Sequence, residues 1–170
     1  MNLSEVIRAI PDFPKPGIMF RDITTMLKDP AAFAECVNLL SDEFKNEKIT
    51  KVVGIESRGF IFGAPVALAL GAGFVPARKP GKLPAQTAKK EYALEYGTDS
   101  IEIHKDALGP EDRVLIVDDL LATGGTAAAA IALVRELGAS VASCAFVIEL
   151  ESLNGRAALG DCDAFSLLCF

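Results

Sequence analysis

The chain has 170 residues, a formal net charge of −6, a hydrophobic fraction of 51% and a charged fraction of 24%. This size and composition fit one globular domain and exclude a chain that is disordered throughout. The net negative charge argues against a general nucleic-acid-binding protein, which needs a basic surface. No apolar run reaches the roughly 18 residues of a membrane-spanning helix, and the N-terminus lacks a secretory-signal pattern. We therefore expect a cytoplasmic protein that binds neither nucleic acid nor membrane.

The first third of the chain is predicted to contain two helices separated by a proline-rich segment. Residues 2–10 are predicted to form a short helix that ends at Pro11. Residues 11–18 contain three prolines and one glycine, so we expect a loop or an extended segment there. Apolar residues recur with helical period in residues 31–47, and Pro30 suits the first turn of that helix.

Strands and helices alternate in the rest of the chain. Residues 52–55, 74–77, 100–104, 114–117, 141–150 and 165–169 are predicted strands, and residues 60–70 and 125–137 are predicted helices. Residues 80–98 are predicted to form a long loop or a hairpin. Alternation of this kind predicts an α/β fold, with a mainly parallel sheet covered by helices on both faces. Ligands bind such sheets at the carboxyl ends of the strands.

Cysteine spacing and the distribution of charge add two expectations. The four cysteines form no CxxC pair and cannot make a zinc site with the single His104, so we expect free thiols. A disulfide between Cys162 and Cys169 is the alternative. Six of the 17 basic residues lie between Ser57 and Lys90, a stretch without Asp or Glu. Such a segment can attract a polyanionic substrate, or it can be a solvated basic loop.

The segment from Val114 to Thr126 carries the strongest functional signal. A hydrophobic strand ends in two carboxylates, Asp118 and Asp119, and a loop of small residues then leads into a helix. Backbone N–H groups at a helix N-terminus bind phosphate, and carboxylates beside them suit sugar hydroxyls or Mg²⁺-bound water. The segment is neither a Walker A loop nor a GxGxxG turn. It is interpreted as a site for a ribose 5-phosphate, the alternative being an ordinary strand–loop–helix junction.

This segment resembles the signature of type I phosphoribosyltransferases, which bind phosphoribosyl pyrophosphate (PRPP). Within that family, the likeness to adenine phosphoribosyltransferases extends over almost the whole chain. Phe20-Arg21-Asp22 and Leu94-Glu95-Tyr96-Gly97 are the pieces that indicate adenine. The segments that carry the likeness are residues 12–24, 54–60, 78–84, 92–97 and 118–126.

The resemblance implies an enzyme of purine salvage that transfers the 5-phosphoribosyl group of PRPP to N9 of adenine. The products would be AMP and pyrophosphate. The cofactor would be Mg²⁺, and the protein would be a homodimer. It implies the type I phosphoribosyltransferase fold in one domain, residues 1–170. A base-binding segment would occupy about residues 1–30, and a mobile lid or hood about residues 80–100. A 6-oxopurine transferase and a PRPP-binding regulatory protein of the same fold remain alternatives.

The resemblance also assigns roles residue by residue. Glu95, Arg58 and Asp118 are the expected catalytic residues, and Mg²⁺ is expected to be held mainly through PRPP and water. The Glu56–Ser57 peptide is expected to be cis. The 5-phosphate and ribose ligands would be Asp118, Asp119, Ala122, Thr123, Gly124, Gly125 and Thr126; the pyrophosphate ligands would be Ser57, Arg58, Arg78, Lys79 and Lys82.

In the adenine-binding segment and the lid, some residues have two possible roles. Met19, Phe20 and Arg21 match the segment that frames the base. The residues alone favour a core position for Phe20, whereas the resemblance implies contact with the base; Arg21 could instead pair with Asp22 or a neighbouring acid. Glu95 and Tyr96 match the lid. A carboxylate at Glu95 could exchange a proton with the purine or could simply be an exposed loop acid.

Overall fold

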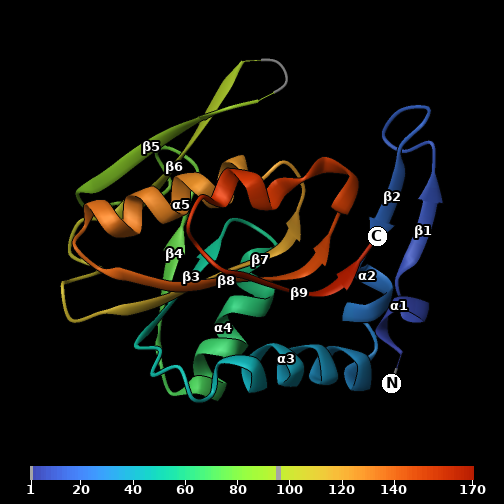
Figure 1. Cartoon of the computed structure of the whole chain (residues 1–170), viewed down its shortest axis with the longest axis horizontal. Helices are drawn as coiled ribbons and strands as arrows, with labels where there is room; N and C mark the ends of the chain where they lie inside the picture. Colours follow the sequence, from blue (N-terminus) through green and yellow to red (C-terminus); the bar gives the residue numbers. More distant parts are fainter. Residues whose placement is uncertain (1, 95–96) are drawn as a thin grey trace.

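The computed structural model describes residues 2–94 and 97–170. Its centre is a five-stranded sheet in the order β4-β3-β7-β8-β9, and every neighbouring pair is parallel (Figure 1). The predicted α/β fold is therefore confirmed. The strands, in chain order, are β3 (Lys51–Ile55), β4 (Gly73–Ala77), β7 (Arg113–Leu121), β8 (Ser140–Glu149) and β9 (Ala164–Cys169).

Helices cover both faces of this sheet, as the alternation predicted. Helices α3 (Pro30–Phe44) and α4 (Gly59–Leu70) lie on one face, and α5 (Gly125–Glu136) lies on the other (Figure 1). Each face has its own apolar cluster, with Phe62 and Leu115 in one and Ile116 and Leu133 in the other. Alternate side chains of a strand point to opposite faces, so one run such as residues 114–117 supplies both clusters.

The predicted helix over residues 2–10 is wrong beyond its first turn. Helix α1 covers only Leu3–Val6, and the chain then forms an antiparallel hairpin of β1 (Arg8–Pro11) and β2 (Met19–Asp22). Backbone pairing with β2 outweighs the helical pattern there. The loop or extended segment predicted for residues 11–18 is confirmed, since Pro11 ends β1 and residues 12–18 form the turn of this hairpin. A short helix, α2 (Thr24–Leu27), follows.

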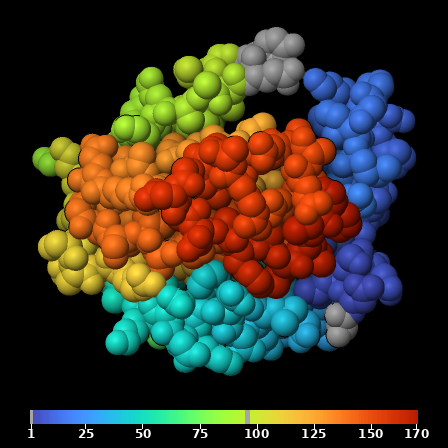
Figure 2. Space-filling view, viewed as in Figure 1, coloured from blue at the N-terminus to red at the C-terminus, as the bar shows by residue number. Residues whose placement is uncertain are grey.

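A second antiparallel hairpin projects from the sheet over α5 (Figure 1). It consists of β5 (Thr87–Ala93) and β6 (Thr98–His104), which confirms the hairpin alternative for residues 80–98. Two 3₁₀ helices, η1 (Glu151–Leu153) and η2 (Gly155–Leu159), connect β8 to β9. Figure 2 shows the C-terminal segment, in red, between α5 and the N-terminal hairpin, in blue.

Strand β7 is longer than predicted. The sequence suggested that the strand ends before Asp118, but pairing with β8 continues to Leu121 opposite Glu149. Both carboxylates therefore belong to the strand, because a parallel neighbour supplies hydrogen bonds along its whole length.

The four cysteines are free, as expected. None of the helices in residues 2–94 and 97–170 has the length and apolar character needed to cross a membrane.

Candidate active site

Three adjoining cavities lie around the carboxyl ends of β3 and β7. A cavity of about 350 Å³ extends along residues 55–58 and shares Arg58 and Asp119 with an apolar cavity of about 170 Å³. It shares Asp118 and Thr126 with a small hollow of about 80 Å³ in the loop before α5. We call them the central cavity, the apolar cavity and the loop hollow. Most residues predicted for the site from separate parts of the chain therefore meet here.

The loop hollow is formed by the turn between β7 and α5. All five residues predicted to bind the 5-phosphate, Ala122 to Thr126, line it. Gly124 has φ +84°, a left-handed conformation that a residue with a side chain adopts at a cost. Because the first N–H groups of a helix have no partner within the helix, the start of α5 presents donors to this hollow. The hollow therefore suits a phosphate.

Asp118 and Asp119 stand side by side where the cavities meet. Asp119 is buried, and its Oδ2 lies 2.7 Å from Nε of Arg58 in an ion pair. Asp118 Oδ1 accepts a hydrogen bond of 2.8 Å from the Asp119 amide. Burial and the adjacent Asp119 charge raise the pKa of Asp118 well above its ordinary value. Two carboxylates this close favour a cation or hydroxyl donors between them.

The turn that carries Ser57 and Arg58 packs closely on β7 because helix α4 begins with a glycine. A Cβ on Gly59 would lie 2.8 Å from the Val117 carbonyl oxygen and 3.0 Å from Asp118 Oδ1. The Glu56–Ser57 peptide in this turn is cis, as the resemblance implied. The missing side chain at Gly59 thus brings the turn and the carboxylates into one cavity.

Glu56 anchors the segment that was predicted to supply cations. Arg78 donates from Nε and Nη2 to the Glu56 carboxylate at 3.2 and 3.1 Å, and the Lys79 amide donates to it at 2.8 Å. Although burial acts in the opposite direction, these hydrogen bonds lower the pKa of Glu56. Arg78 is thus held by Glu56, which lines the central cavity, but Arg78 itself does not line that cavity.

Lys79 connects the central cavity to the β5–β6 hairpin. Its Nζ lies 2.9 Å from the Tyr92 hydroxyl and forms an ion pair with Asp99. Hydrogen bonds from Lys79 and the Ser100 amide lower the pKa of Asp99. Of the three predicted cations in this segment, only Lys79 lines the described cavity, and Lys82 is exposed.

The apolar cavity is bounded by the N-terminal hairpin and the end of the sheet. Met19, Phe20 and Arg21, the three residues predicted to frame adenine, all line it. The Phe20 ring is half-buried and contacts the Phe13 ring edge to face, with centroids 5.1 Å apart. Leu120, Ile148 and Leu150 also line it. These last three were missed because they belong to ordinary apolar strand patterns.

Arg21 and its neighbour Asp22 have different partners. The Arg21 guanidinium lies 4.0 Å from the centre of the Phe170 ring, so Arg21 does not pair with Asp22. Asp22 instead accepts hydrogen bonds from Thr24 and forms an ion pair with Arg8. Hydrogen bonds from Thr24 and then from Arg8 lower the pKa of Asp22 to about 2. Arg8 on β1 lies directly opposite Asp22 on β2, so this ion pair joins the two strands of the hairpin.

Two predicted site residues, Glu95 and Tyr96, lie outside the described residues. The site also contains residues that the sequence analysis did not single out, namely Glu56, Tyr92 and Asp99. Tyr92 belongs to a segment that carried the family resemblance, which was the available signal. Within residues 2–94 and 97–170, no group of three or more His, Cys, Asp or Glu side chains forms a metal-binding cluster.

Comparison with known proteins places this geometry in a family. The family model described as "Phosphoribosyl transferase domain" matches residues 23–160. A relative named adenine phosphoribosyltransferase, from Synechococcus sp., is 58% identical over 170 residues, covering 100% of this chain and 99% of that protein. The chain belongs to the adenine phosphoribosyltransferases. The predicted family and enzyme class are thereby confirmed.

Solved structures of family members agree with the observed fold. An adenine phosphoribosyltransferase from Thermoanaerobacter pseudethanolicus has a TM-score of 0.95 and 54% identity, covering 99% of this chain and 100% of that one. A Saccharomyces cerevisiae adenine phosphoribosyltransferase, complexed with D-2,5-dideoxy-2,5-imino-altritol 1,6-bisphosphate and adenine, has a TM-score of 0.92. It is 45% identical and covers 98% of this chain and 96% of that one. The predicted type I phosphoribosyltransferase fold is confirmed.

Proposed function

We propose that the protein transfers the 5-phosphoribosyl group of PRPP to N9 of adenine, giving AMP and pyrophosphate, and that the three cavities bind the two substrates. The observation that carries this proposal is the way the cavities adjoin. An apolar slot meets a polar cavity at Arg58 and Asp119, and that cavity meets a phosphate-type loop at Asp118 and Thr126. Base, ribose with pyrophosphate, and 5-phosphate each have a compartment of matching chemistry.

The loop of Ala122 to Thr126 holds the 5-phosphate. Its backbone N–H groups and the two threonine hydroxyls are the donors, and the α5 dipole adds to the attraction. Asp118 and Asp119 accept hydrogen bonds from the ribose hydroxyls beside it. The phosphate and the ribose are then fixed at two points, which aligns C1 of the sugar between the base and the leaving group.

Ser57, Arg58 and Lys79 line the compartment for the departing pyrophosphate. Arg58 and Lys79 offset its negative charge as the bond to C1 breaks. The same cavity also contains the Asp118 and Asp119 carboxylates, and these oxygens suit the water bound to a Mg²⁺ ion that PRPP holds. Mg²⁺ bound to PRPP supplies further neutralisation of the leaving group. We propose that Arg78 and Lys82 also bind the pyrophosphate, either in the same subunit or across a dimer interface.

Adenine occupies the apolar cavity, where Phe20 offers an aromatic face and the backbone of residues 19–21 offers polar groups to the ring edge. N9 then points toward Arg58 and Asp119 at the junction. A 6-oxopurine would place an acceptor where adenine has an amino donor, so the base is chosen by these backbone groups. Glu95 and Tyr96 are proposed to close the site, and Glu95 to exchange a proton with the purine.

We also propose a homodimer. Apolar side chains on α4 and the adjacent β4 are exposed: Leu68 has 84% of its surface accessible, Ile61 37% and Phe74 36%. An exposed group of this kind is typical of a protein–protein contact. Sedimentation of Leu68→Glu should show a monomer where the unmodified chain sediments as a dimer. An unmodified chain that sediments as a monomer contradicts the proposal.

The remaining expectations concern location and domain organisation. Four free thiols suit the reducing cytoplasm, where we place the enzyme. Residues 1–170 are proposed to act as one catalytic domain, with residues 1–30 contributing the base site. Residues 80–100, which include most of the β5–β6 hairpin, are proposed to act as the lid or hood. Limited proteolysis with and without PRPP tests the lid, because protection confined to that segment is expected.

A panel of purine bases is the test of the proposed reaction. The purified protein is incubated with PRPP and Mg²⁺, and separately with adenine, hypoxanthine, guanine or xanthine, while nucleotide and pyrophosphate are measured together. AMP formed only with adenine is the expected result. Another nucleotide would overturn the base assignment and keep the transfer. Absence of any product with PRPP still bound would indicate the regulatory alternative.

A further inference from the structure

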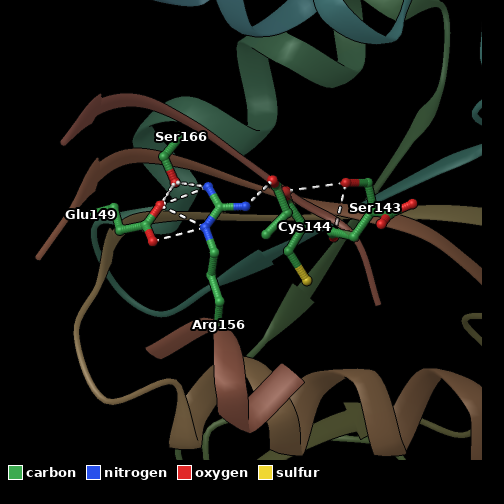
Figure 3. A network of polar contacts seen from close by, with 7 residues as sticks. Ser143, Cys144, Glu149, Arg156 and Ser166 are labelled. Atoms are coloured by element: carbon green, nitrogen blue, oxygen red, sulfur yellow. Dashed lines mark hydrogen bonds and ion pairs between the residues drawn. The ribbon is translucent and has the colours of Figure 1, made fainter. Parts of the chain in front are cut away.

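A polar cluster that the proposed reaction does not use lies close to residues 122–126, which we call the phosphate loop. It consists of Glu149, Arg156 and Ser166, and we call it the Arg156 cluster (Figure 3). Arg156 donates from Nε to Glu149 Oε1 at 2.8 Å and from Nη2 to Oε2 at 2.7 Å. The Ser166 hydroxyl donates to the same carboxylate at 2.7 Å. Glu149 is buried, so this carboxylate is fully engaged by its neighbours.

The cluster joins three separate elements. Glu149 is the last residue of β8, Ser166 belongs to β9, and Arg156 lies in η2. Arg156 also donates from Nη1 to the Ala164 carbonyl oxygen at 2.6 Å. The Arg156 guanidinium therefore hydrogen-bonds to both β8 and β9 and holds η2 against them. Its planar geometry lets it donate to two oxygen atoms at once.

The residue before Arg156 packs directly against the phosphate loop. A Cβ on Gly155 would lie 2.3 Å from the Ala122 carbonyl oxygen, and a Cβ on Gly124 would lie 2.3 Å from the Gly155 carbonyl oxygen. The two glycines thus allow backbone to touch backbone. Any displacement of η2 changes the space available to residues 122–124, because interiors this close transmit movement.

The phosphate loop has few internal contacts that fix its backbone conformation. Gly124 precedes α5 without a side-chain cap and holds a left-handed conformation, and Gly125 follows it. Glycine is the residue with most backbone freedom to lose, so external contacts must select the bound conformation. The contact that does so on this side is η2.

We propose that the Arg156 cluster is a positioning cluster: by holding η2 against residues 122–124, it sets the affinity of the loop for the 5-phosphate. None of its three residues lines the three cavities in the described part of the chain. The inference rests on the proposed role of the loop and adds residues that act through it. It predicts a selective loss of phosphate binding when the cluster is weakened.

Arg156→Lys is the variant to examine, because it keeps the charge and removes the fork. Arg113→Lys is its matched control. Arg113 donates from Nη2 to the Glu47 carboxylate at 2.7 Å and from Nε to the Glu47 carbonyl oxygen at 2.6 Å, so its partners are of the same kinds. It lies at the first residue of β7, at the opposite end of the sheet from the loop.

The readout is the ratio of the Kd for adenosine to the Kd for AMP, measured by calorimetry. The two ligands differ only in the 5-phosphate, so the ratio isolates its contribution. Arg156→Lys should lower the ratio about tenfold, the effect of one lost charge-assisted hydrogen bond, and leave the Kd for adenosine unchanged. Arg113→Lys should leave the ratio at its original value. Ser166→Ala, a milder change, should lower it about threefold.

The possible outcomes separate the two proposals. If the unmodified chain binds AMP no better than adenosine, the phosphate role of the loop fails, and the positioning role fails with it. If the unmodified chain prefers AMP and both cluster variants keep that preference, only the Arg156 cluster assignment is overturned. Equal weakening of both ligands in both variants would also overturn it, since that result indicates a general loss of structure.

Discussion

The close approach of Gly59 to β7 leads to a prediction about catalysis that stability alone would not reveal. In Gly59→Ala the new Cβ would start 2.8 Å from the Val117 carbonyl oxygen and 3.0 Å from Asp118 Oδ1. A carbon atom normally keeps about 3.5 Å from its neighbours, so the first turn of α4 must move by roughly 0.5–0.7 Å. Ser57 and Arg58 immediately precede that turn and would move with it.

The expected effects on stability and on activity differ in size. Overpacking costs about 1–3 kcal/mol, and the better helix propensity of alanine returns about 1 kcal/mol, so the free energy of unfolding should fall by about 0–2 kcal/mol. Misplacement of about 1 Å can cost about 100-fold in rate, so half of that should lower kcat/KM for PRPP about tenfold. Urea unfolding and steady-state kinetics measure the two quantities.

Gly63→Ala serves as the matched control within the same helix. Its Cβ would meet a ring carbon of Phe74 at 3.0 Å and the Gly54 Cα at 3.3 Å, and neither residue lines the three cavities. We expect a comparable change in unfolding free energy with kcat/KM within about threefold of the original. A Gly59→Ala enzyme with unchanged kcat/KM, or one no more impaired than Gly63→Ala, would refute the reasoning.

Three further predictions concern the site and the hairpin. Arg58→Ala and Asp118→Asn should each lower kcat at least about 100-fold with near-original circular dichroism; unchanged kinetics in both would remove the site assignment. The pKa of Asp22 is about 2 when folded against an ordinary 3.8, so its contribution of about 1–2 kcal/mol is present above pH 4 and lost as pH falls toward 2. Acid titration of stability should show this loss, and Asp22→Asn should lack it. Phe170→Ala should free Arg21 and raise KM for adenine about threefold; an equal rise in KM for PRPP would contradict that.

Local patterns in the sequence determined most of the secondary structure and the position of the phosphate loop. The helix at α3, with proline in its first turn, and the buried strands at β3, β7 and β8 follow from the spacing of apolar residues. The junction of residues 118–126 was recognisable because its glycines, hydroxyls and carboxylates are consecutive. Each of these features depends on neighbours within about ten residues.

Tertiary structure decided the features that depend on distant partners. Residues 8–11 form a strand because residues 19–22 pair with them, and β7 continues past Asp118 because β8 runs beside it. Lys79 meets Asp99, and Arg21 meets Phe170, through folding alone. Periodicity describes which face of an element is apolar, but not which element covers that face. Side-chain partners across the sheet therefore became visible only once the chain had folded.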